Sequence, residues 1–345
     1  MLRSFRGPIA IAMAAGVLFA ACGGAGGTAQ PSATTAASAA PSAPRLGGIN
    51  RPIQLAITPS GDVQSYTASG NAIASALGQA TGLAWKVSVP TSYAAQIEAM
   101  CSGQTDVGFI APLQMTLLLD KKCGTPVLAA LRKDETGKLA PTYNSQILVR
   151  SDSGINDVNG LKGKKFAFVS SLSASGYLFP ALTVKKASNQ DPKTFFASTI
   201  FAGGHPQAAL AVYNGQVDGA STFVDVRVTT PGGTTITSGM PADILTKTKV
   251  ISTAGPIPND GIAFRANFPA DIAAQVKKAL LDYAASDAGK KTLGDPKFIG
   301  WDGIQEVTAT FYDDMKAAAT LAGIDVAAEA AKTPTPVTPA PTKAP

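Results

Sequence analysis

The sequence has few of the residues on which metal sites and many enzymes depend. It contains one histidine, His205, and three cysteines, and no Cys-x-x-Cys spacing occurs, so ligands for a metal are poorly placed. It has no Gly-x-Ser-x-Gly elbow, and no carboxylate evidently orients the imidazole, which counts against a hydrolase built from a serine and His205. Lys and Arg nowhere alternate with aromatic residues, which argues against nucleic-acid binding. We therefore expect no metal, no cofactor and no enzyme activity.

Long apolar runs are also missing, apart from one near the N-terminus. Residues 9–21 are apolar, follow Arg3 and Arg6, and are too short for a comfortable membrane span. The run ends in Leu18-Phe-Ala-Ala-Cys22, which resembles the lipobox of bacterial lipoproteins, with Phe19 where Leu is usual. This predicts a signal peptide over residues 1–21 and an extracytoplasmic protein anchored to the membrane by a lipid on Cys22. The alternatives are an ordinary secretory signal with a chance cysteine, or an uncleaved anchor.

Low-complexity segments flank the part of the chain that is expected to fold. Residues 22–50 are rich in Gly, Ala, Ser, Thr and Pro and predict a flexible tether. Residues 332–345 repeat Thr-Pro and Ala-Pro and predict a disordered tail. The remaining roughly 280 residues suffice for two modest lobes, and we expect a monomer. The net charge of +6 includes four cations outside this core, so it says little about a ligand.

The other two cysteines, Cys101 and Cys123, each end a predicted helix. In an exported chain they can form a disulfide, which would stabilise the fold by about 3 kcal/mol through the loop that it closes. The alternative is a pair of separate buried thiols.

Two strand-to-helix turns carry the most distinctive residues. A strand at residues 164–169 and a helix at residues 177–187 enclose Ser171, Ser173, Ser175 and Gly176. His205 lies between a strand at residues 199–202 and a helix at residues 207–214. Helix N-termini present free N–H groups and favour anions, and serine hydroxyls add donors without charge. The pair of turns predicts a site for a tetrahedral oxyanion; the alternative is that the serines only form a turn and cap a helix.

The same local pattern occurs twice in the chain. Residues 95–109 and 208–220 each read as a helix, a Gly-Gln-x-Asp turn and a short apolar strand. Gly103 and Gly215 are expected to end the helices, and Asp106 and Asp218 to fix the turns. The repetition fits two similar α/β lobes.

The remaining pattern alternates strands with helices, which predicts parallel α/β sheets. Further helices are expected at residues 67–80, 93–102 and 269–285, and a last one with Ile304, Val307, Phe311 and Met315 on one face. Further strands are expected at residues 52–58, 83–89, 107–110, 126–131 and 146–150.

Five motifs in order resemble the phosphate/phosphite/phosphonate-binding proteins of ABC importers, from about residue 51 to residue 322. They are Tyr93-Ala-Ala-Gln-Ile-Glu-Ala-Met with Gly-Gln-Thr-Asp, Tyr143-Asn-Ser-Gln-Ile-Leu-Val, Ser173-Ala-Ser-Gly-Tyr-Leu-Phe-Pro, Gly204-His-Pro with Asn-Gly-Gln-Val-Asp, and Pro256-Ile-Pro-Asn-Asp260. The resemblance implies the type II periplasmic binding protein fold, an α/β fold of two lobes joined by two hinge strands. We expect lobe 1 at residues 51–145 and 259–325, and lobe 2 at residues 146–258.

The resemblance also implies which residues contact the ligand. Tyr93 and Tyr143 would offer hydroxyls or ring faces, and Ser173, the Ala174 backbone, Ser175 and His205 would hold the phosphorus oxygens. Many relatives carry Thr where this chain has Ala174, so one hydroxyl is missing. Asp225 and Asp260 fall where relatives that bind aminophosphonates can carry acidic groups.

The function implied is that of a solute-binding protein that delivers phosphonate, phosphite or phosphate to a permease and its ATPase. A type II binding protein for a sulfonate or a thiamine precursor is the nearest alternative, and a Ser/His hydrolase is a more distant one.

Overall fold

The structure is a computed structural model that describes residues 44–332 apart from positions 135, 225 and 231. The predicted signal peptide, Cys22, most of the predicted tether, Asp225 and residues 333–345 therefore lie outside the described residues. In the part that is described, no helix has both the length and the apolar character needed to cross a membrane.

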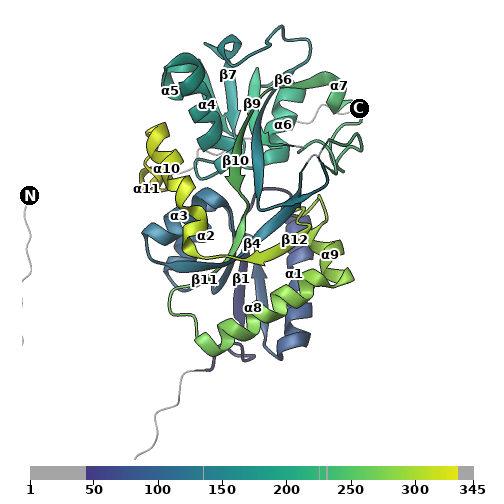
Figure 1. The fold of residues 1–345 in the computed structure, drawn as a ribbon, viewed down its shortest axis with the longest axis vertical. Coiled ribbons are helices and arrows are strands. Elements are labelled where there is room, and N and C mark those ends of the chain that lie inside the picture. Colours follow the sequence, from purple (N-terminus) through teal and green to yellow (C-terminus); the bar gives the residue numbers. More distant parts are fainter. Residues whose placement is uncertain (1–43, 135, 225, 231, 333–345) are drawn as a thin grey trace, which may run out of the picture. The chain divides into compact units, whose positions relative to one another are not determined.

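The first of two sheets has the strand order β12–β4–β11–β3–β1–β2, with β5 paired to β4. Helices α1, α8 and α9 cover one face, and α2 and α3 lie against the other (Figure 1). We call this sheet and its helices the first lobe. Its elements are β1 (Ile53–Ile57), α1 (Val63–Thr81), β2 (Trp85–Ser88), α2 (Tyr93–Cys101), β3 (Val107–Ile110), α3 (Pro112–Asp120), β4 (Gly124–Lys133), β5 (Leu139–Ala140), β11 (Gly261–Arg265), α8 (Ala270–Ala285), α9 (Asp287–Leu293) and β12 (Gly303–Glu306).

The second sheet has the order β10–β6–β9–β7–β8. Helix α6 packs against one apolar cluster of this sheet, while α4 and α5 contribute to another. We call this sheet and its helices the second lobe. Its elements are β6 (Thr142–Arg150), η1 (Asn159–Leu161), β7 (Lys165–Phe168), the π-helix η2 (Ala174–Leu178), α4 (Phe179–Ser188), α5 (Pro192–Phe195), β8 (Ser198–Phe201), α6 (His205–Tyr213), β9 (Gly219–Phe223), α7 (Ile244–Lys247) and β10 (Thr248–Pro258).

The chain passes between the two sheets at two adjacent points. It enters the second sheet at β6 and leaves it at β10, and Thr142 pairs with Pro258 where these strands begin and end. Asn259 holds the two passages together, because its backbone N–H donates to the Pro141 carbonyl (2.8 Å) and its amide donates to the carbonyls of Ala130 (3.1 Å) and Ala140 (3.0 Å).

The C-terminal helices contact both lobes. After η3 (Ala309–Tyr312), helix α10 (Asp313–Ala322) packs against α3 of the first lobe and α4 of the second, and α11 (Val326–Ala331) follows. Lys185 Nζ on α4 donates to the Leu321 carbonyl at 3.0 Å. The Ser171 hydroxyl donates to the Glu329 carbonyl at 3.1 Å. Helices α10 and α11 therefore connect the lobes at a third place, in addition to the two passages of the chain.

The expectation of parallel sheets is only partly correct. Strand β1 pairs in parallel with β2 and β3, and β7 with β8 and β9, as βαβ connections require. The strands that bring the chain to the hinge and back, β4, β6, β10 and β11, pair in antiparallel fashion, as does β12. Both sheets are mixed.

The predicted last helix is wrong in its first part. Ile304 lies in the edge strand β12, opposite Ala130, while Phe311 lies in η3 and Met315 in α10. The helical spacing of these residues is therefore a coincidence across three consecutive elements. Residues 303–306 form a strand because they pair with the edge of β4.

The tether prediction also extends too far. Leu46 is buried in the core of the first lobe, and the Gly47 carbonyl accepts a hydrogen bond from Ala84 N at 2.7 Å. Residues 44–50 thus belong to the folded part of the chain.

The repeated helix–Gly-Gln-x-Asp–strand pattern is present in both lobes. Helices α2 and α6 are followed by Gly103 (φ +74°) and Gly215 (φ +68°), which adopt the left-handed conformation that glycine tolerates. The Asp106 carboxylate accepts from the N–H of Gln54 on β1 at 2.9 Å, and that of Asp218 accepts from Lys165 N–H on β7 at 2.8 Å. Both aspartates therefore fix the start of the neighbouring parallel strand.

Of the alternatives for the two core cysteines, the structure contains the disulfide. Cys101 and Cys123 are joined, with Cα atoms 4.7 Å apart. The bond connects the end of α2 to the start of β4 in the first lobe.

Candidate functional site: the cleft between the lobes

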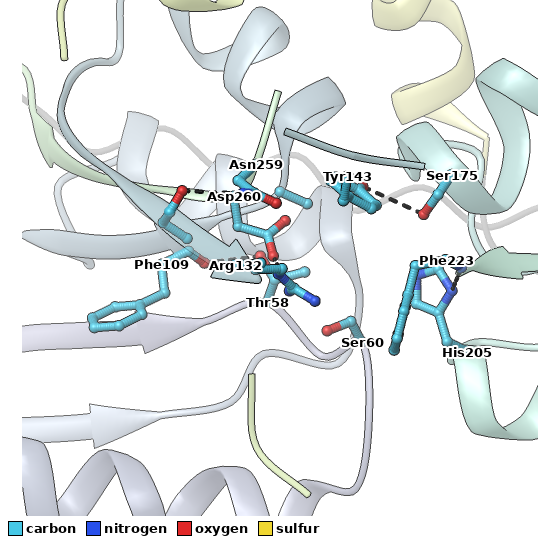
Figure 2. A network of polar contacts seen from close by, with 12 residues as sticks. Thr58, Ser60, Phe109, Arg132, Tyr143, Ser175, His205, Phe223, Asn259 and Asp260 are labelled. Atoms are coloured by element: carbon cyan, nitrogen blue, oxygen red, sulfur yellow. Dashed lines mark hydrogen bonds and ion pairs between the residues drawn. The ribbon is translucent and has the colours of Figure 1, made fainter. Parts of the chain in front are cut away.

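A cleft of about 1120 Å³ lies between the two lobes. The first lobe contributes the loop after β1, the start of α2 and the end of β4, and the second contributes the turns after β7 and β8 (Figure 2). Its inner polar residues are Ser60, Tyr66, Tyr93, Arg132, Tyr143, Ser173, Ser175, His205 and Asp260.

The serine turn of the second lobe is closely packed. The Ser173 hydroxyl accepts from Gly176 N–H at 3.0 Å and caps the π-helix η2. A side chain at Gly176 would place its Cβ 2.5 Å from Val169, so only glycine allows this approach. The Ser175 carbonyl accepts from the Ser145 hydroxyl at 2.7 Å. The turn is therefore fixed before any ligand arrives.

Within the serine turn, the hydroxyl of Ser175 contacts the side chain of Tyr143. The Tyr143 hydroxyl donates to Ser175 Oγ at 3.3 Å, so the proton of Ser175 remains available for an acceptor in the cleft. Burial raises the pKa of Tyr143 above its usual range, so this phenol stays a neutral donor.

His205 is the first residue of α6 and is buried. Its Nδ1 accepts from the backbone N–H of Phe223 at 3.2 Å, and its ring packs on the Phe223 ring with centroids 4.8 Å apart. Burial lowers the pKa of His205 to about 3, and the charge of Arg132 acts in the same direction. The imidazole is therefore neutral, and because Nδ1 is an acceptor, Nε2 carries the proton that can be donated.

The backbone of His205 also connects the lobes. Its N–H donates to the Ser60 carbonyl of the first lobe at 3.1 Å. The N–H at this helix terminus is thus occupied, so any donor that His205 offers to a ligand comes from its side chain.

Phenols dominate the first-lobe side of the cleft. Tyr93 begins α2, whose first turn is capped by Ser92, and burial raises the pKa of Tyr93 well above its usual range. The Tyr66 hydroxyl is 2.9 Å from Ser60 Oγ, and burial raises the pKa of Tyr66 to about 12. These hydroxyls are neutral at any physiological pH.

Arg132 and Asp260 form an ion pair in the cleft. Arg132 Nη2 donates to Asp260 Oδ2 at 3.1 Å. The guanidinium lies 5.6 Å from the ring centroid of Tyr143 and 5.7 Å from that of Phe223, within the range of cation–π attraction. Burial raises the pKa of Asp260, while Arg132 opposes that shift.

Seven of the eight contact residues predicted from sequence line this cleft: Tyr93, Tyr143, Ser173, Ala174, Ser175, His205 and Asp260. The eighth, Asp225, lies outside the described residues. Ser171, which the sequence grouped with the other serines, does not line the cleft and bonds to α11 instead. That the seven residues contact a ligand stays a prediction.

Sequence reasoning missed Arg132 and Ser60. The available signal for Arg132 was its position directly after the apolar run of residues 127–131, because strand ends in α/β proteins form binding clefts. Ser60 belongs to a Pro-Ser-Gly-Asp turn that predicted nothing more than a turn.

The geometry of His205 is not that of a general base in a hydrolase. Among the described residues its ring nitrogens bond only to a backbone N–H, and no carboxylate orients the ring. A pKa of about 3 also leaves the ring a very weak base.

Residues 55–312 match the family model described as "ABC transporter, phosphonate, periplasmic substrate-binding protein". The chain belongs to this family. The phosphate-import protein PhnD of Mycolicibacterium smegmatis is 34% identical over 185 residues, which cover 51% of this chain and 56% of that protein. The phosphonates-binding periplasmic protein of Escherichia coli is 28% identical over 217 residues, covering 61% of this chain and 58% of that protein. The matches thus span less than two thirds of either relative.

A solved structure shares the fold of this chain. PhnD1 of Prochlorococcus marinus, solved in complex with methylphosphonate, superposes with a TM-score of 0.66 over 78% of this chain and 97% of that one, at 14% identity. At this identity the likeness establishes the fold alone.

Proposed function

We propose that the protein is the extracytoplasmic solute-binding component of an ABC importer, and that it binds a phosphonate, phosphite or phosphate ion in the cleft. A permease and an ATPase on separate chains would then take up the ligand. The names of the relatives, a phosphate-import protein and a phosphonates-binding protein, support this class of ligand.

The observation that carries the proposal is the convergence of donors from both lobes on one cleft. Ser175 and His205 offer neutral donors from the second lobe, while Arg132 brings a positive charge from the first. A small oxyanion can leave water only if most of its oxygens find such donors. Because the donors lie on different lobes, the ion would be held best when the lobes are together.

Identification of a retained ligand tests the proposal directly. Protein purified gently without added ligand should release a phosphorus-containing anion, detected by mass spectrometry. Calorimetry with methylphosphonate, phosphite and phosphate should then show saturable binding. Methanesulfonate is the matched control, since it has the same tetrahedral shape but one charge fewer than fully ionised methylphosphonate. Tighter binding of methanesulfonate than of every phosphorus anion would favour a sulfonate-binding protein.

The lipid anchor is a separate proposal. With acyl chains on Cys22, the wild-type protein should partition into detergent, since each buried methylene contributes about 0.8 kcal/mol. Cys22→Ala should carry no lipid, as mass spectrometry of the mature protein would show. An intact N-terminus, or a cleavage site elsewhere on the mature protein, would refute lipidation at Cys22 and leave the ligand proposal untouched.

A further inference from the structure

The Arg132–Asp260 pair is a fixed feature of the cleft. The two side chains come from neighbouring strands, at the end of β4 and just before β11, and only 20% and 25% of their surfaces are exposed. The rings of Tyr143 and Phe223 hold the guanidinium on further sides. Figure 2 shows the pair on the first-lobe side, across from His205 and Phe223. A cation held in this way cannot easily turn away from an incoming ligand.

The ion pair leaves Arg132 with unused hydrogen-bond donors but matches the charge of Asp260. A guanidinium has five N–H donors in a planar fork, and Asp260 engages only Nη2. Within the described residues, Nη1 and Nε make no hydrogen bond, and Nε is buried. Arg132 therefore has donors left over, whereas the negative charge of Asp260 is already matched.

This asymmetry affects a ligand that carries an ammonium group. Such a group would seek a carboxylate, but Asp260 already faces a guanidinium, and a second cation beside Arg132 would meet like-charge repulsion. The neutral imidazole of His205 and the neutral phenols offer no compensating negative charge. Three other aspartates among the described residues line the cleft, Asp62, Asp134 and Asp302, and each already accepts a hydrogen bond from a nearby backbone N–H. An oxyanion without an amino group meets the donors of Ser175 and His205 and the positive charge of Arg132.

We propose that Arg132 is a specificity-determining residue that makes the cleft select phosphorus oxyanions without an amino group over aminoalkylphosphonates. The inference rests on the proposed function, because it takes for granted that the cleft binds phosphorus oxyanions. It goes beyond that function in assigning the choice among them to one ion pair.

Calorimetry on ligand-free full-length protein, with methylphosphonate and 2-aminoethylphosphonate as the two probes, tests this inference. The wild type should bind methylphosphonate at least about tenfold more tightly, since a charge-assisted hydrogen bond and a like-charge contact both act in that direction. Arg132→Gln should reduce this preference by about tenfold or more, by weakening methylphosphonate and tolerating the ammonium. Arg132→Lys keeps the charge and should keep the direction of the preference.

Asp260→Asn provides a second measurement that does not depend on how Arg132→Gln folds. If Asp260 serves only Arg132, this variant should bind methylphosphonate as well as the wild type does, or more tightly, and should keep the preference. Arg265→Gln is the matched control. It removes another first-lobe arginine that pairs with an aspartate, Asp106 at 2.7 Å, but does not line the cleft, so the preference should not change.

The outcomes separate the two proposals. A wild type that prefers 2-aminoethylphosphonate overturns the role of Arg132 and leaves the proposed function standing. So does a preference that survives Arg132→Gln unchanged, or an Asp260→Asn variant that loses only 2-aminoethylphosphonate. A wild type that binds no phosphorus anion overturns both.

Discussion

The two lobes are built on the same local unit but bring different chemistry to the cleft. In each, a helix ends at a left-handed glycine, and an aspartate then fixes the neighbouring parallel strand, Asp106 in the first lobe and Asp218 in the second. The first lobe adds an ion pair and a disulfide. The second adds hydroxyls and a neutral imidazole. Scaffold and binding chemistry are thus separable, because the cleft residues lie at strand ends and loops that vary independently of the sheets.

This division of labour has a physical consequence. Ser175 and His205 are the neutral donors of the second lobe. They can match the shape of an oxyanion, but they do not distinguish one net charge from another. The ion pair of Arg132 and Asp260 on the first lobe can make that distinction, because Coulomb interactions strengthen when water is excluded. Removal of the Ser175 hydroxyl on the second lobe should therefore lower affinity, whereas replacement of Arg132 on the first lobe should also change selectivity.

The largest expected effect is on stability, and it should be confined to the first lobe. Replacing both Cys101 and Cys123 by serine should lower the free energy of unfolding by about 3 kcal/mol, because the closed loop spans 22 residues. Urea titration measures the loss, and wild type under reducing conditions should show the same decrease. Ligand affinity should be kept, since neither cysteine lines the cleft. An unchanged free energy would mean that the bond does not constrain the unfolded chain.

The second prediction tests the neutral donors of the second lobe. Ser175→Ala should weaken methylphosphonate binding by roughly 1.5–3 kcal/mol, the contribution of a hydrogen bond to a charged group. Calorimetry gives the value directly. Tyr143→Phe is the matched variant, because it removes the hydroxyl that bonds to Ser175 but leaves the serine, and its effect should be smaller. Equal affinity in Ser175→Ala and wild type would reduce the serine to a structural role.

The third prediction concerns pH. The His205 pKa is about 3 in the folded protein and near 6.5 in an unfolded chain. Between these values the unfolded state binds a proton that the folded state does not, so folding stability is lost as pH falls below about 6.5. From pH 7 to pH 5 the wild type should lose about 2 kcal/mol more than His205→Gln, which cannot titrate.

Urea titrations of both proteins at the two pH values check this difference. Parallel losses in wild type and variant would show that the imidazole is accessible to protons in the folded state.

The smallest expected effect separates the two serines. Ser173 caps the π-helix through Gly176, so Ser173→Ala should lower stability by about 1 kcal/mol, as loss of an N-cap usually does. Among the described residues, the side-chain bond of Ser175 comes from the Tyr143 hydroxyl and not from a backbone N–H, so Ser175→Ala should shift the melting temperature less. Thermal unfolding of both variants measures this difference. A larger decrease in melting temperature for Ser175→Ala than for Ser173→Ala would exchange the roles assigned to the two serines.

Cleft residues that lie close together in the sequence can be predicted from it, and those that lie far apart cannot. The serine turn and the turn at His205 are contiguous segments, so their strand-to-helix positions could be inferred from local pattern alone. Arg132 and Asp260 are 128 positions apart, and only the pairing of β4 with β11 brings them together. Likewise, the lowered pKa of His205 comes from its burial and from the charge of Arg132, and Arg132 is 73 positions away in the sequence.

Sequence distance also accounts for the strands that local pattern did not predict. Local periodicity located the βαβ parts of both sheets, because apolar runs between helices reflect burial on two faces. It missed β10 and β11, and it assigned Ile304 to a helix. These strands form by antiparallel pairing with distant segments, such as Gly303 with Leu131, and such pairing leaves little trace in local spacing.

Asn259 has a mechanical consequence. Because its backbone and amide bond to Pro141, Ala130 and Ala140, neither passage of the chain between the sheets can bend without the other. A rotation of one lobe against the other would therefore have to move these peptide units together. The time for which the cleft stays shut then depends on the stiffness of this joint as well as on the ligand. A residue that touches no ligand can in this way set the rate at which one is released.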